Sequence, residues 1–528
     1  MAGDGGETRN NEKMYSNKVN VNILTALLVS HGVEHAVVCP GSRNSAIVHN
    51  LNACPSIKCY PVTDERSAGF YALGMAQALK RPVVVCVTSG TALLNLAPAV
   101  AEAYYQHIPL VAISADRPPQ WIDQLDGQTL SQPDALGRFV RKAVTLPEPH
   151  DAEEKWYCNR LVNEALIAAM QGGGGPVHIN VPITEPLFEY TIEELPIERK
   201  IEFKVADMSP ATLSHVTRMF LQAKRPMLIC GQPMNPLMDE AVSLVGDDEA
   251  YIPDFVLYIG GSIVSKRLKR FLRKAKETWV VNETGEVTDT FMNLTHVVQG
   301  DGEAVADHIR FMLVTEPHPF VQKWDELLAH IRDRADAYEP AYSQMSAVKY
   351  FESLVSDAVV HYANSTAIRL ANIYARHPVY CNRGVNGIEG SLSTAAGFSV
   401  VSNEMVYCVI GDLSFFYDQN ALWNQNLRGN LRILLLNNGR GGIFNMLPGL
   451  EQSPARDKYV SAEHHTTAEG ICRQNDVVYL SAHDAHELPS AIDTLLYIES
   501  DRPVLLEVFT DADTDAVVFK LYNSSFER

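Results

Sequence analysis

The sequence predicts an α/β protein made of three consecutive parallel-sheet domains. Short, almost continuous apolar segments such as 82–87 and 431–437 alternate with helix-length segments. Strands of this composition are typical of parallel sheets that are covered by helices on both faces. No short-period repeat is present, and 528 residues are enough for several domains with buried cores.

The first block is predicted to span residues 19–188. It follows a polar segment, 1–18, which is rich in glycine and asparagine and is expected to be disordered. The strands of this block, each with the loop that follows it, are HAVVC before PGSRN, KCYPV before TDER, PVVVCV before TSGT, PLVAIS before ADRPP, and PVHINVP.

The middle block, 189–330, is short. Its helix ending near Val245 runs through Gly246 and Asp247 almost directly into the next strand, FVLYIGG. The third block, 331–528, contains the predicted strands VYC, MVYCVIG, LRILLLN and PVLLEVF.

Composition limits the function. Charged side chains number 44 basic and 63 acidic, for a net charge of −19, which opposes nucleic-acid binding. An anionic substrate must therefore be held by locally concentrated arginines. Nine scattered cysteines without a CxxC pair, the lack of a long apolar run and the lack of a signal-peptide core predict a reduced, cytoplasmic protein.

Two polar residues end neighbouring predicted strands of the third block. Asp412 ends MVYCVIGD, and Asn438 ends LRILLLNN. Because the carboxyl ends of parallel strands share one edge of a sheet, these side chains are expected to lie close together. Either residue alone is as readily explained as a helix cap or a turn residue. Together, their oxygens suit a hydrated divalent cation that grips a phosphate.

The GD and NN pairs at this spacing resemble the diphosphate-binding motif of thiamine diphosphate (ThDP) enzymes. The resemblance implies that Asp412, the Asn438 side chain and the Arg440 carbonyl ligate Mg²⁺ or Mn²⁺, which bridges to the diphosphate. Arg440 departs from the family, which has a small residue there. Further cofactor contacts are implied for Ser365, Leu413, Ser414, Ile443, Phe444 and Leu447, of which the last three would form an apolar wall beside the thiazolium.

A ThDP enzyme also needs a carboxylic acid against the aminopyrimidine ring, and Glu65 is the candidate. It follows the strand KCYPV and opens a predicted helix, with Ala68 and Gly69 at the family spacing. The alternative role for Glu65 is an acid that favours a helix N-terminus. Thr63 or Asp64 could equally cap that helix.

The motifs PGSRN, TDER, SADRPP, NSTAIRL, NRGVNGIEGS and GDLSFFYDQ resemble one ThDP subfamily from about Asn20 onward. This is the MenD subfamily, the 2-succinyl-5-enolpyruvyl-6-hydroxy-3-cyclohexene-1-carboxylate (SEPHCHC) synthases of menaquinone biosynthesis. The resemblance implies decarboxylation of 2-oxoglutarate on ThDP and conjugate addition of the resulting carbanion to isochorismate, giving SEPHCHC and CO₂. The three blocks would then be pyrimidine-binding, central and diphosphate-binding domains.

Both of these substrates are dianions, which guanidinium groups bind through paired hydrogen bonds. The resemblance implies substrate contacts from Ser42, Arg43, Arg117, Gln128, Arg267, Arg369 and Arg383. Each arginine alone is as readily a surface residue. Gly127 stands where the family has asparagine, so that contact is absent or comes from another residue.

The resemblance further implies a homodimer or homotetramer with active sites between subunits, Glu65 coming from one chain and Asp412 from its neighbour. Relatives carry an additional loop and strand after Val245, so this protein is shorter there or a segment is missing near Gly246 and Asp247.

Three other classes of protein fit the sequence less well. An acetolactate-synthase type of carboligase or decarboxylase would need fewer arginines than this chain carries. A catalytically silent ThDP-fold regulatory subunit would be expected to have lost Glu65 or the metal residues. A Rossmann dehydrogenase is disfavoured because no GxGxxG follows the first strand of any block.

Overall fold

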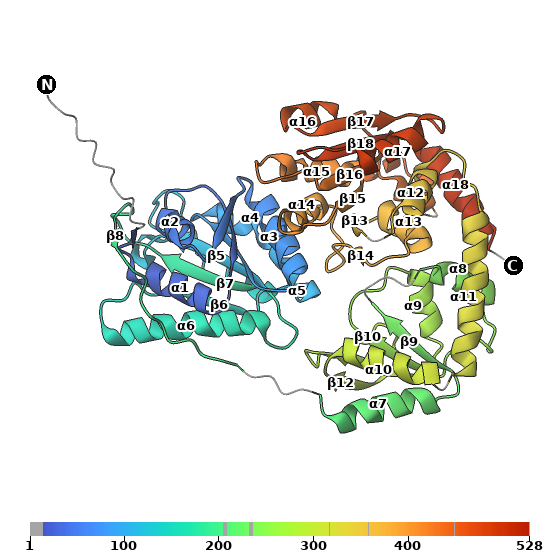
Figure 1. The fold of residues 1–528 in the computed structure, drawn as a ribbon, viewed down its shortest axis with the longest axis horizontal. Coiled ribbons are helices and arrows are strands. Elements are labelled where there is room, and N and C mark those ends of the chain that lie inside the picture. The colour runs from blue at the N-terminus through green and yellow to red at the C-terminus, as the bar shows by residue number, and fades with distance from the viewer. Residues whose placement is uncertain are drawn as a thin grey trace. The chain divides into compact units, whose positions relative to one another are not determined.

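The computed structural model describes residues 14–203, 208–231, 236–315, 317–356, 358–447 and 449–526 (Figure 1). The chain forms two compact units, Met1–Phe203 and Lys204–Arg528, which are described separately below. The first unit contains one six-stranded parallel sheet, and the second contains a four-stranded and a six-stranded parallel sheet. The predicted class, three parallel α/β domains, is confirmed.

The sheet of the first unit has the strand order β3-β2-β4-β5-β7-β6, with every neighbouring pair parallel. The chain passes from β2 to β3 on one side and then to β4 on the other, so the topological switch lies between β2 and β4. The strands are β2 His35–Val38, β3 Lys58–Pro61, β4 Val83–Val87, β5 Leu110–Asp116, β6 Lys142–Thr145 and β7 Val177–Pro182.

Helices cover this sheet on both faces. On one face, α1, α2 and α6 bury Leu24, Ile47 and Val162 in the same cluster as the strand residues Val84 and Ile113 (Figure 1). The helices are α1 Val19–Ser30, α2 Ser45–Ala53, α3 Glu65–Leu79, α4 Thr91–Asn95, α5 Ala97–Gln106 and α6 Ala152–Met170, with short 3₁₀ turns η1 Pro119–Trp121 and η2 Gly137–Phe139.

Regular structure begins closer to the N-terminus than the sequence suggested. Strand β1, Tyr15–Ser16, pairs antiparallel with β8, Tyr190–Ile192. The Ser16 backbone N–H also donates to the side chain of Asn50, at 2.8 Å. The disorder expected over 1–18 therefore does not extend to these residues, while residues 1–13 lie outside the described part of the chain.

The central sheet has the order β12-β11-β10-β9 and is parallel throughout. Helices α7 and α10 pack on one face around Phe220 and Trp279, and α8, α9 and α11 pack on the other around Leu268 and Trp324. The elements are α7 Pro210–Gln222, β9 Pro226–Cys230, α8 Met238–Val245, β10 Phe255–Ile259, α9 Lys266–Leu272, β11 Glu277–Asn282, β12 Leu294–Gln299, α10 Gly302–Thr315 and α11 Pro319–Ala337.

The expected limits of the central block, 189 and 330, fall at different kinds of position in the structure. Residues 189–203 belong to the first compact unit, and position 330 lies inside helix α11. After α8, the chain turns at Gly246, whose φ is +56°, and the Asp248 N–H donates to the Val245 carbonyl at 3.0 Å. The structure thus closes the short connection to β10 with a tight turn.

The third sheet has the order β14-β13-β15-β16-β18-β17, again all parallel, with the topological switch between β13 and β15. Its strands are β13 Val359–Tyr362, β14 Val379–Tyr380, β15 Val406–Gly411, β16 Leu431–Asn437, β17 Val478–Ala482 and β18 Val504–Phe509. Its helices are α12 Gln344–Leu354, α13 Thr366–Tyr374, α14 Ser391–Val401, α15 Asp412–Tyr417, α16 Glu469–Gln474, α17 Glu487–Tyr497 and α18 Ala512–Ser524. Single helical turns are η3 Gln419–Leu422, η4 Gly442–Met446, η5 Leu450–Gln452 and η6 Arg456–Val460, the last of π type.

The two sheets of the second unit share one hydrophobic cluster. Trp324 of α11 and Ala241 of α8 belong to the same cluster as Phe351 of α12 and Ile373 of α13. The Leu237 N–H also donates to the Asn372 carbonyl at 2.9 Å. This common core explains why residues 204–528 form a single unit.

All nine cysteines are free. In the part of the chain that the structure describes, none of the helices combines the length and the apolarity that crossing a bilayer requires.

Candidate functional site

Asp412 joins the ends of β15 and β16 at the carboxyl edge of the third sheet. It is the first residue of α15 and is 4% exposed. Its Oδ2 accepts the backbone N–H groups of Asn438 at 3.1 Å and Gly439 at 2.8 Å, and its Oδ1 accepts that of Leu413 at 2.7 Å. The structure therefore brings the two strand ends together as the sequence predicted.

Asn438 has one side-chain atom satisfied and one that is not. Its Nδ2 donates to Oδ2 of Asp515 on α18, at 2.9 Å. Its Oδ1 is buried without a hydrogen-bond partner among the described residues. A buried carbonyl oxygen without a partner is costly in a folded protein, so this atom points to a ligand.

These donors fit a hard divalent cation such as Mg²⁺ or Mn²⁺. The Asp412 carboxylate, Asn438 Oδ1 and the backbone carbonyl of Arg440 are all oxygen donors, which such cations prefer. Over the described ranges, no cluster of three or more His, Cys, Asp or Glu side chains could hold a metal. With a single carboxylate, the candidate set leaves positions that suit water and phosphate oxygens.

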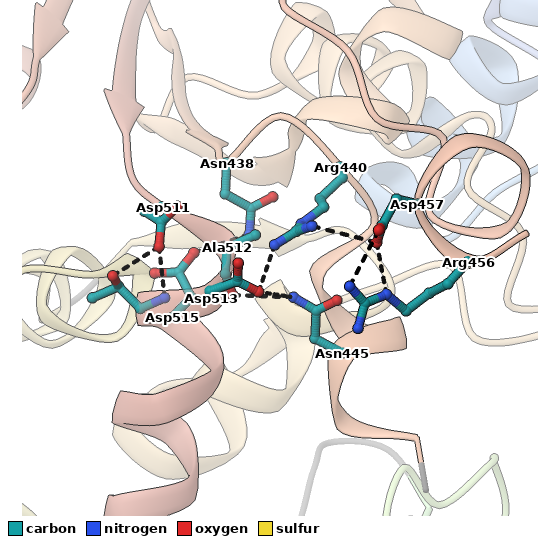
Figure 2. A network of polar contacts seen from close by, with 10 residues as sticks. Asn438, Arg440, Asn445, Arg456, Asp457, Asp511, Ala512, Asp513 and Asp515 are labelled. Atoms are coloured by element: carbon teal, nitrogen blue, oxygen red, sulfur yellow. Dashed lines mark hydrogen bonds and ion pairs between the residues drawn. The ribbon is translucent and has the colours of Figure 1, made fainter. Parts of the chain in front are cut away.

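The side chain of Arg440 turns away from this turn toward two carboxylates (Figure 2). Its Nη2 lies 2.6 Å from Oδ1 of Asp513 in the first turn of α18, and its Nη1 lies 3.5 Å from Oδ1 of Asp457 in η6. The sequence had left open whether this side chain reaches a diphosphate or solvent. In the structure it pairs with acids, and it is only 12% exposed.

Two residues near the turn could not be found from the sequence motifs. His464 has its Nε2 3.4 Å from Asp412 Oδ2, and its backbone N–H donates to the Gly439 carbonyl. Asp515 accepts the Asn438 amide, and burial raises the pKa of its carboxyl. The only sequence signal for Asp515 is the acidic start of the last helix, TDADTDA.

Ser365 stands at the switch point, between the end of β13 and the start of α13, with a strained backbone. Its φ is +73° and its ψ is −126°, which only glycine adopts readily. Such strain often accompanies functional positions. Beside it, Thr366 lines a cavity together with Asn438, Gly442 and Asp515. The cavity holds about 320 Å³ of empty space, part of it open to solvent.

The candidate apolar wall follows the metal turn. Ile443 and Phe444 lie in η4 and are half-buried, whereas Leu447 is 47% exposed. Ser414, on α15, is 5% exposed. Apolar side chains thus stay partly open to solvent near the turn, within the second unit.

Glu65 is the first residue of α3 and does not cap it. The cap is Asp64, which accepts the N–H groups of Arg66 and Ser67 at 2.9 and 3.2 Å. The half-buried Glu65 accepts a hydrogen bond from Asn95 Nδ2 at 3.1 Å. Glu65 is also the acidic residue of the first turn of α3, so the alternative role that the sequence allowed, an acid at a helix N-terminus, fits this position as well.

Arg43 and Arg117 lie near each other at the carboxyl edge of the first sheet. Arg43 is buried and donates to the Ile183 carbonyl at 3.0 Å. Glu185 Oε1 lies 3.3 Å from Nη2 of Arg43 and 4.0 Å from Nη1 of Arg117. Arg117 also pairs with Asp126 at 3.1 Å. Both guanidiniums therefore already have acidic partners, which the sequence analysis did not foresee.

Ser42 and Gln128 lie in two loops near the switch point of the first sheet. Ser42 is exposed, beside the buried Arg43. Gln128 has a φ of +56° and packs its backbone against Gly90, where an added Cβ would lie 3.3 Å away. Arg117 Nη2 donates to the Gly127 carbonyl at 2.9 Å, so the residue that departs from the family pattern contacts a candidate arginine through its backbone.

Arg369 and Arg383 come together in the second unit. Arg383 Nη1 donates to Asn364 Oδ1 at 3.0 Å, while its Nε is buried without a hydrogen-bond partner among the described residues. Burial first, and then the charge of Arg383, lowers the pKa of Arg369, against the attraction of Asp239. Two cations whose charges repel each other favour an anionic ligand between them.

Arg267 differs from these two arginines, because it is exposed on α9 and donates to Ser243 Oγ at 2.5 Å. Lys269, on the same helix, is the cation that interacts with Arg383. Burial first, and then Arg383, lowers the pKa of Lys269. Lys269 could not be identified from the sequence, because a basic helix face does not indicate which of its residues turns inward.

Comparison with known proteins matches parts of both units to thiamine pyrophosphate enzymes. Residues 20–136 match the family model of the N-terminal TPP binding domain, and residues 363–508 match that of the C-terminal TPP binding domain. These matches include Glu65 in the first unit and Asp412 and Asn438 in the second. The fold and the matched domains define a thiamine pyrophosphate-dependent enzyme.

Relatives that match nearly the whole chain identify the family within this class of enzymes. The 2-succinyl-5-enolpyruvyl-6-hydroxy-3-cyclohexene-1-carboxylate synthases of Bacteroides fragilis and Bacteroides thetaiotaomicron are both 43% identical, covering 96% of this chain and 99% of theirs. The same enzyme of Porphyromonas gingivalis is 35% identical over 96% of this chain and 97% of its own. The chain belongs to this family of synthases, as the sequence motifs predicted.

A solved structure supports the fold alone. Benzoylformate decarboxylase from Polynucleobacter necessarius matches with a TM-score of 0.70 at 16% identity, covering 94% of this chain and 99% of that one.

Proposed function

We propose that this protein decarboxylates 2-oxoglutarate and adds the remaining four-carbon unit to isochorismate, giving SEPHCHC and CO₂ in menaquinone biosynthesis. The reaction would depend on ThDP and on Mg²⁺ or Mn²⁺, in the cytoplasm. The observation that carries the proposal is the 43% identity, over 96% of the chain, to synthases named for this product. When bound, ThDP supplies the nucleophile and the electron sink that decarboxylation of a 2-oxoacid needs.

In this proposal, the turn after β16 holds the cation and, through it, the diphosphate. Asp412, Asn438 Oδ1 and the Arg440 carbonyl are the ligands. The unpartnered Asn438 Oδ1 supports this role, because it lies beside a carboxylate held by three backbone N–H groups. Leu413, Ser414 and Ser365 would contact the cofactor at the two strand ends beside the switch point.

Glu65 would hold a proton against the aminopyrimidine ring of the cofactor. Its freedom from helix capping supports this role, since Asp64 performs the capping. Burial of the carboxyl by the bound ring would favour its protonated form, which can donate to a ring nitrogen. Ile443, Phe444 and Leu447 would exclude water on the thiazolium side.

The arginines would hold the carboxylates of two dianionic substrates. Arg369 and Arg383 are the best supported, because their charges interact and the Nε of Arg383 is buried without a hydrogen-bond partner among the described residues. Arg43 and Arg117, with Ser42 and Gln128, would act from the first unit. These two arginines share Glu185, so substrate binding there requires that carboxylate to move aside or remain as a neighbour. Arg267 is the least supported, because it is exposed.

We also propose a homodimer or homotetramer in which Glu65 of one subunit and Asp412 of another serve the same cofactor. A cofactor with a pyrimidine at one end and a diphosphate at the other needs both residues, and they lie in different compact units of the chain.

A donor and acceptor panel tests the function. The protein with ThDP and Mg²⁺ is given 2-oxoglutarate or pyruvate, each with and without isochorismate, and CO₂ release is followed. The proposal expects turnover with 2-oxoglutarate and isochorismate together. Acetolactate from pyruvate would instead support the acetolactate-synthase type, and no turnover with any pair would support a silent regulatory subunit.

A further inference from the structure

The side chain of Arg440 ties the candidate metal turn to two neighbouring segments (Figure 2). It leaves the turn after β16 and pairs with Asp513 at the start of α18 and with Asp457 in η6, at 2.6 and 3.5 Å. The same residue is the proposed source of a metal-binding carbonyl. Its backbone and its side chain therefore have separate partners.

Asp513 has partners in both the metal turn and η4, namely Arg440 and Asn445. Asn445, in η4, donates its Nδ2 to Oδ1 of Asp513 at 3.1 Å and to the Ala512 carbonyl at 3.4 Å. Asp513 therefore binds both the metal turn and η4 to the first turn of α18. A carboxylate at this helix position is also favoured by the helix dipole.

Asp457 makes the second connection. Arg456 Nε and Nη2 donate to the two oxygens of Asp457, at 2.6 and 3.2 Å, and this pairing, with Arg440 nearby, lowers the pKa of Asp457. Arg440 thus approaches a carboxylate that is already ionised and oriented. Its guanidinium is mostly buried and faces two negative charges, so it is not directed at a phosphate.

We propose that Arg440 is a positioning residue whose guanidinium holds the metal turn against α18 and η6 before any cofactor binds. The inference rests on the proposed metal and diphosphate site, which it extends to a residue that departs from the family pattern. The side chain would act by reducing the number of conformations that the turn has to give up when the cation binds, which raises affinity without any contact to the ligand.

The first test uses hydrogen exchange of the cofactor-free, full-length protein, followed by mass spectrometry. Arg440→Ala is expected to raise exchange in residues 438–447 and 449–460 and at the start of α18, and Arg440→Lys is expected to raise it less. The matched control is Arg473→Ala, which removes an exposed ion pair with Glu469 on α16. Unchanged exchange in Arg440→Ala would overturn the proposal.

The second test measures the affinity for ThDP in the presence of Mg²⁺ by calorimetry. Arg440→Ala and Asp513→Asn are each expected to raise Kd about tenfold, which equals about 1.4 kcal/mol. The double variant should lose less affinity than the sum of the two single losses, because both substitutions remove the Arg440–Asp513 pair. If Arg440 contacted the diphosphate directly, Arg440→Ala would still raise the Kd for ThDP. Asp513→Asn would then leave the Kd unchanged or lower it, and that result would refute the positioning role.

The two tests separate this inference from the proposed function. If the unaltered protein bound no ThDP, the proposed function would fail. The exchange experiment would still decide whether Arg440 holds the turn, because it needs no cofactor. Thermal melting of each variant shows whether the whole unit stays folded, so that a local change in exchange is distinguished from general unfolding.

Discussion

Asn438 donates its side-chain Nδ2 to Asp515 at 2.9 Å, and this bond fixes which face of the amide carries the free Oδ1. Asp515 Oδ2 also accepts from Thr510 Oγ1, and its Oδ1 accepts the Gln344 N–H, each at 2.8 Å. Both carboxylate oxygens therefore face donors. The proposed metal ligand Asn438 is thus oriented by a half-buried acid from the last helix.

Asp515→Asn is expected to weaken Mg²⁺-dependent ThDP binding and to destabilise the second unit. An asparagine at 515 must turn its own NH₂ group toward a donor in either orientation, which leaves buried groups unpaired at a cost of about 1–3 kcal/mol. Calorimetry and thermal melting measure the two effects. A variant that melted and bound like the unaltered protein would refute the orienting role of Asp515.

Mixing two inactive variants tests whether the site is shared between subunits. Glu65→Gln and Asp412→Ala are each expected to abolish turnover. If Glu65 and Asp412 of one site come from different chains, co-expressed variants should recover about a quarter of the activity, because about half of randomly paired dimers contain both variants and each has one intact site. No recovery in mixed dimers whose formation is verified by mass spectrometry would place both residues in one chain.

Arg383→Ala is expected to raise KM for a dianionic substrate by about ten- to a hundredfold, since a charge-assisted hydrogen bond contributes about 1.5–3 kcal/mol. Steady-state kinetics at saturating ThDP measures this. Arg81→Ala is the control, because Arg81 forms an exposed pair with Glu34 in the first unit. An unchanged KM for both substrates in Arg383→Ala would remove Arg383 from the binding site.

Stability should fall as the solution is made acidic, in part through His361 on β13. Burial lowers the pKa of this histidine to about 3, from an ordinary value of 6.5. Between these values the unfolded chain binds a proton that the folded chain does not, so stability decreases as pH falls, by about 1.4 kcal/mol per pH unit. His361→Leu should show a smaller slope in urea midpoints between pH 6.5 and pH 5. An equal slope in both proteins would show that other groups control this range.

The sequence was sufficient to predict features that depend on strand ends. Asp412 and Asn438 were singled out because the carboxyl ends of parallel strands share an edge. Glu65 was singled out by resemblance, because Ala68 and Gly69 follow it at the spacing of ThDP enzymes. The direction of the Arg440 side chain could not be predicted, because its partners Asp457 and Asp513 come from segments whose position depends on tertiary packing.

The domain organisation likewise combines features that follow from local sequence with features that depend on tertiary packing. Three parallel sheets follow from the alternation of strands and helices. The division into two compact units does not, because it depends on the common core that α8 and α11 form with α12 and α13. The short strand β1 was missed because the polar residues around Tyr15 resemble a disordered terminus until β8 supplies a pairing partner.

The most direct test of the proposed function is the complete reaction. The purified protein is incubated with ThDP, Mg²⁺, 2-oxoglutarate and isochorismate, and isochorismate loss, CO₂ release and product mass are followed together. The account predicts one CO₂ for each isochorismate consumed, a product with the mass of SEPHCHC, and no turnover when ThDP or the metal is withheld. Isochorismate that stays unchanged while the protein is folded and saturated with ThDP would contradict it.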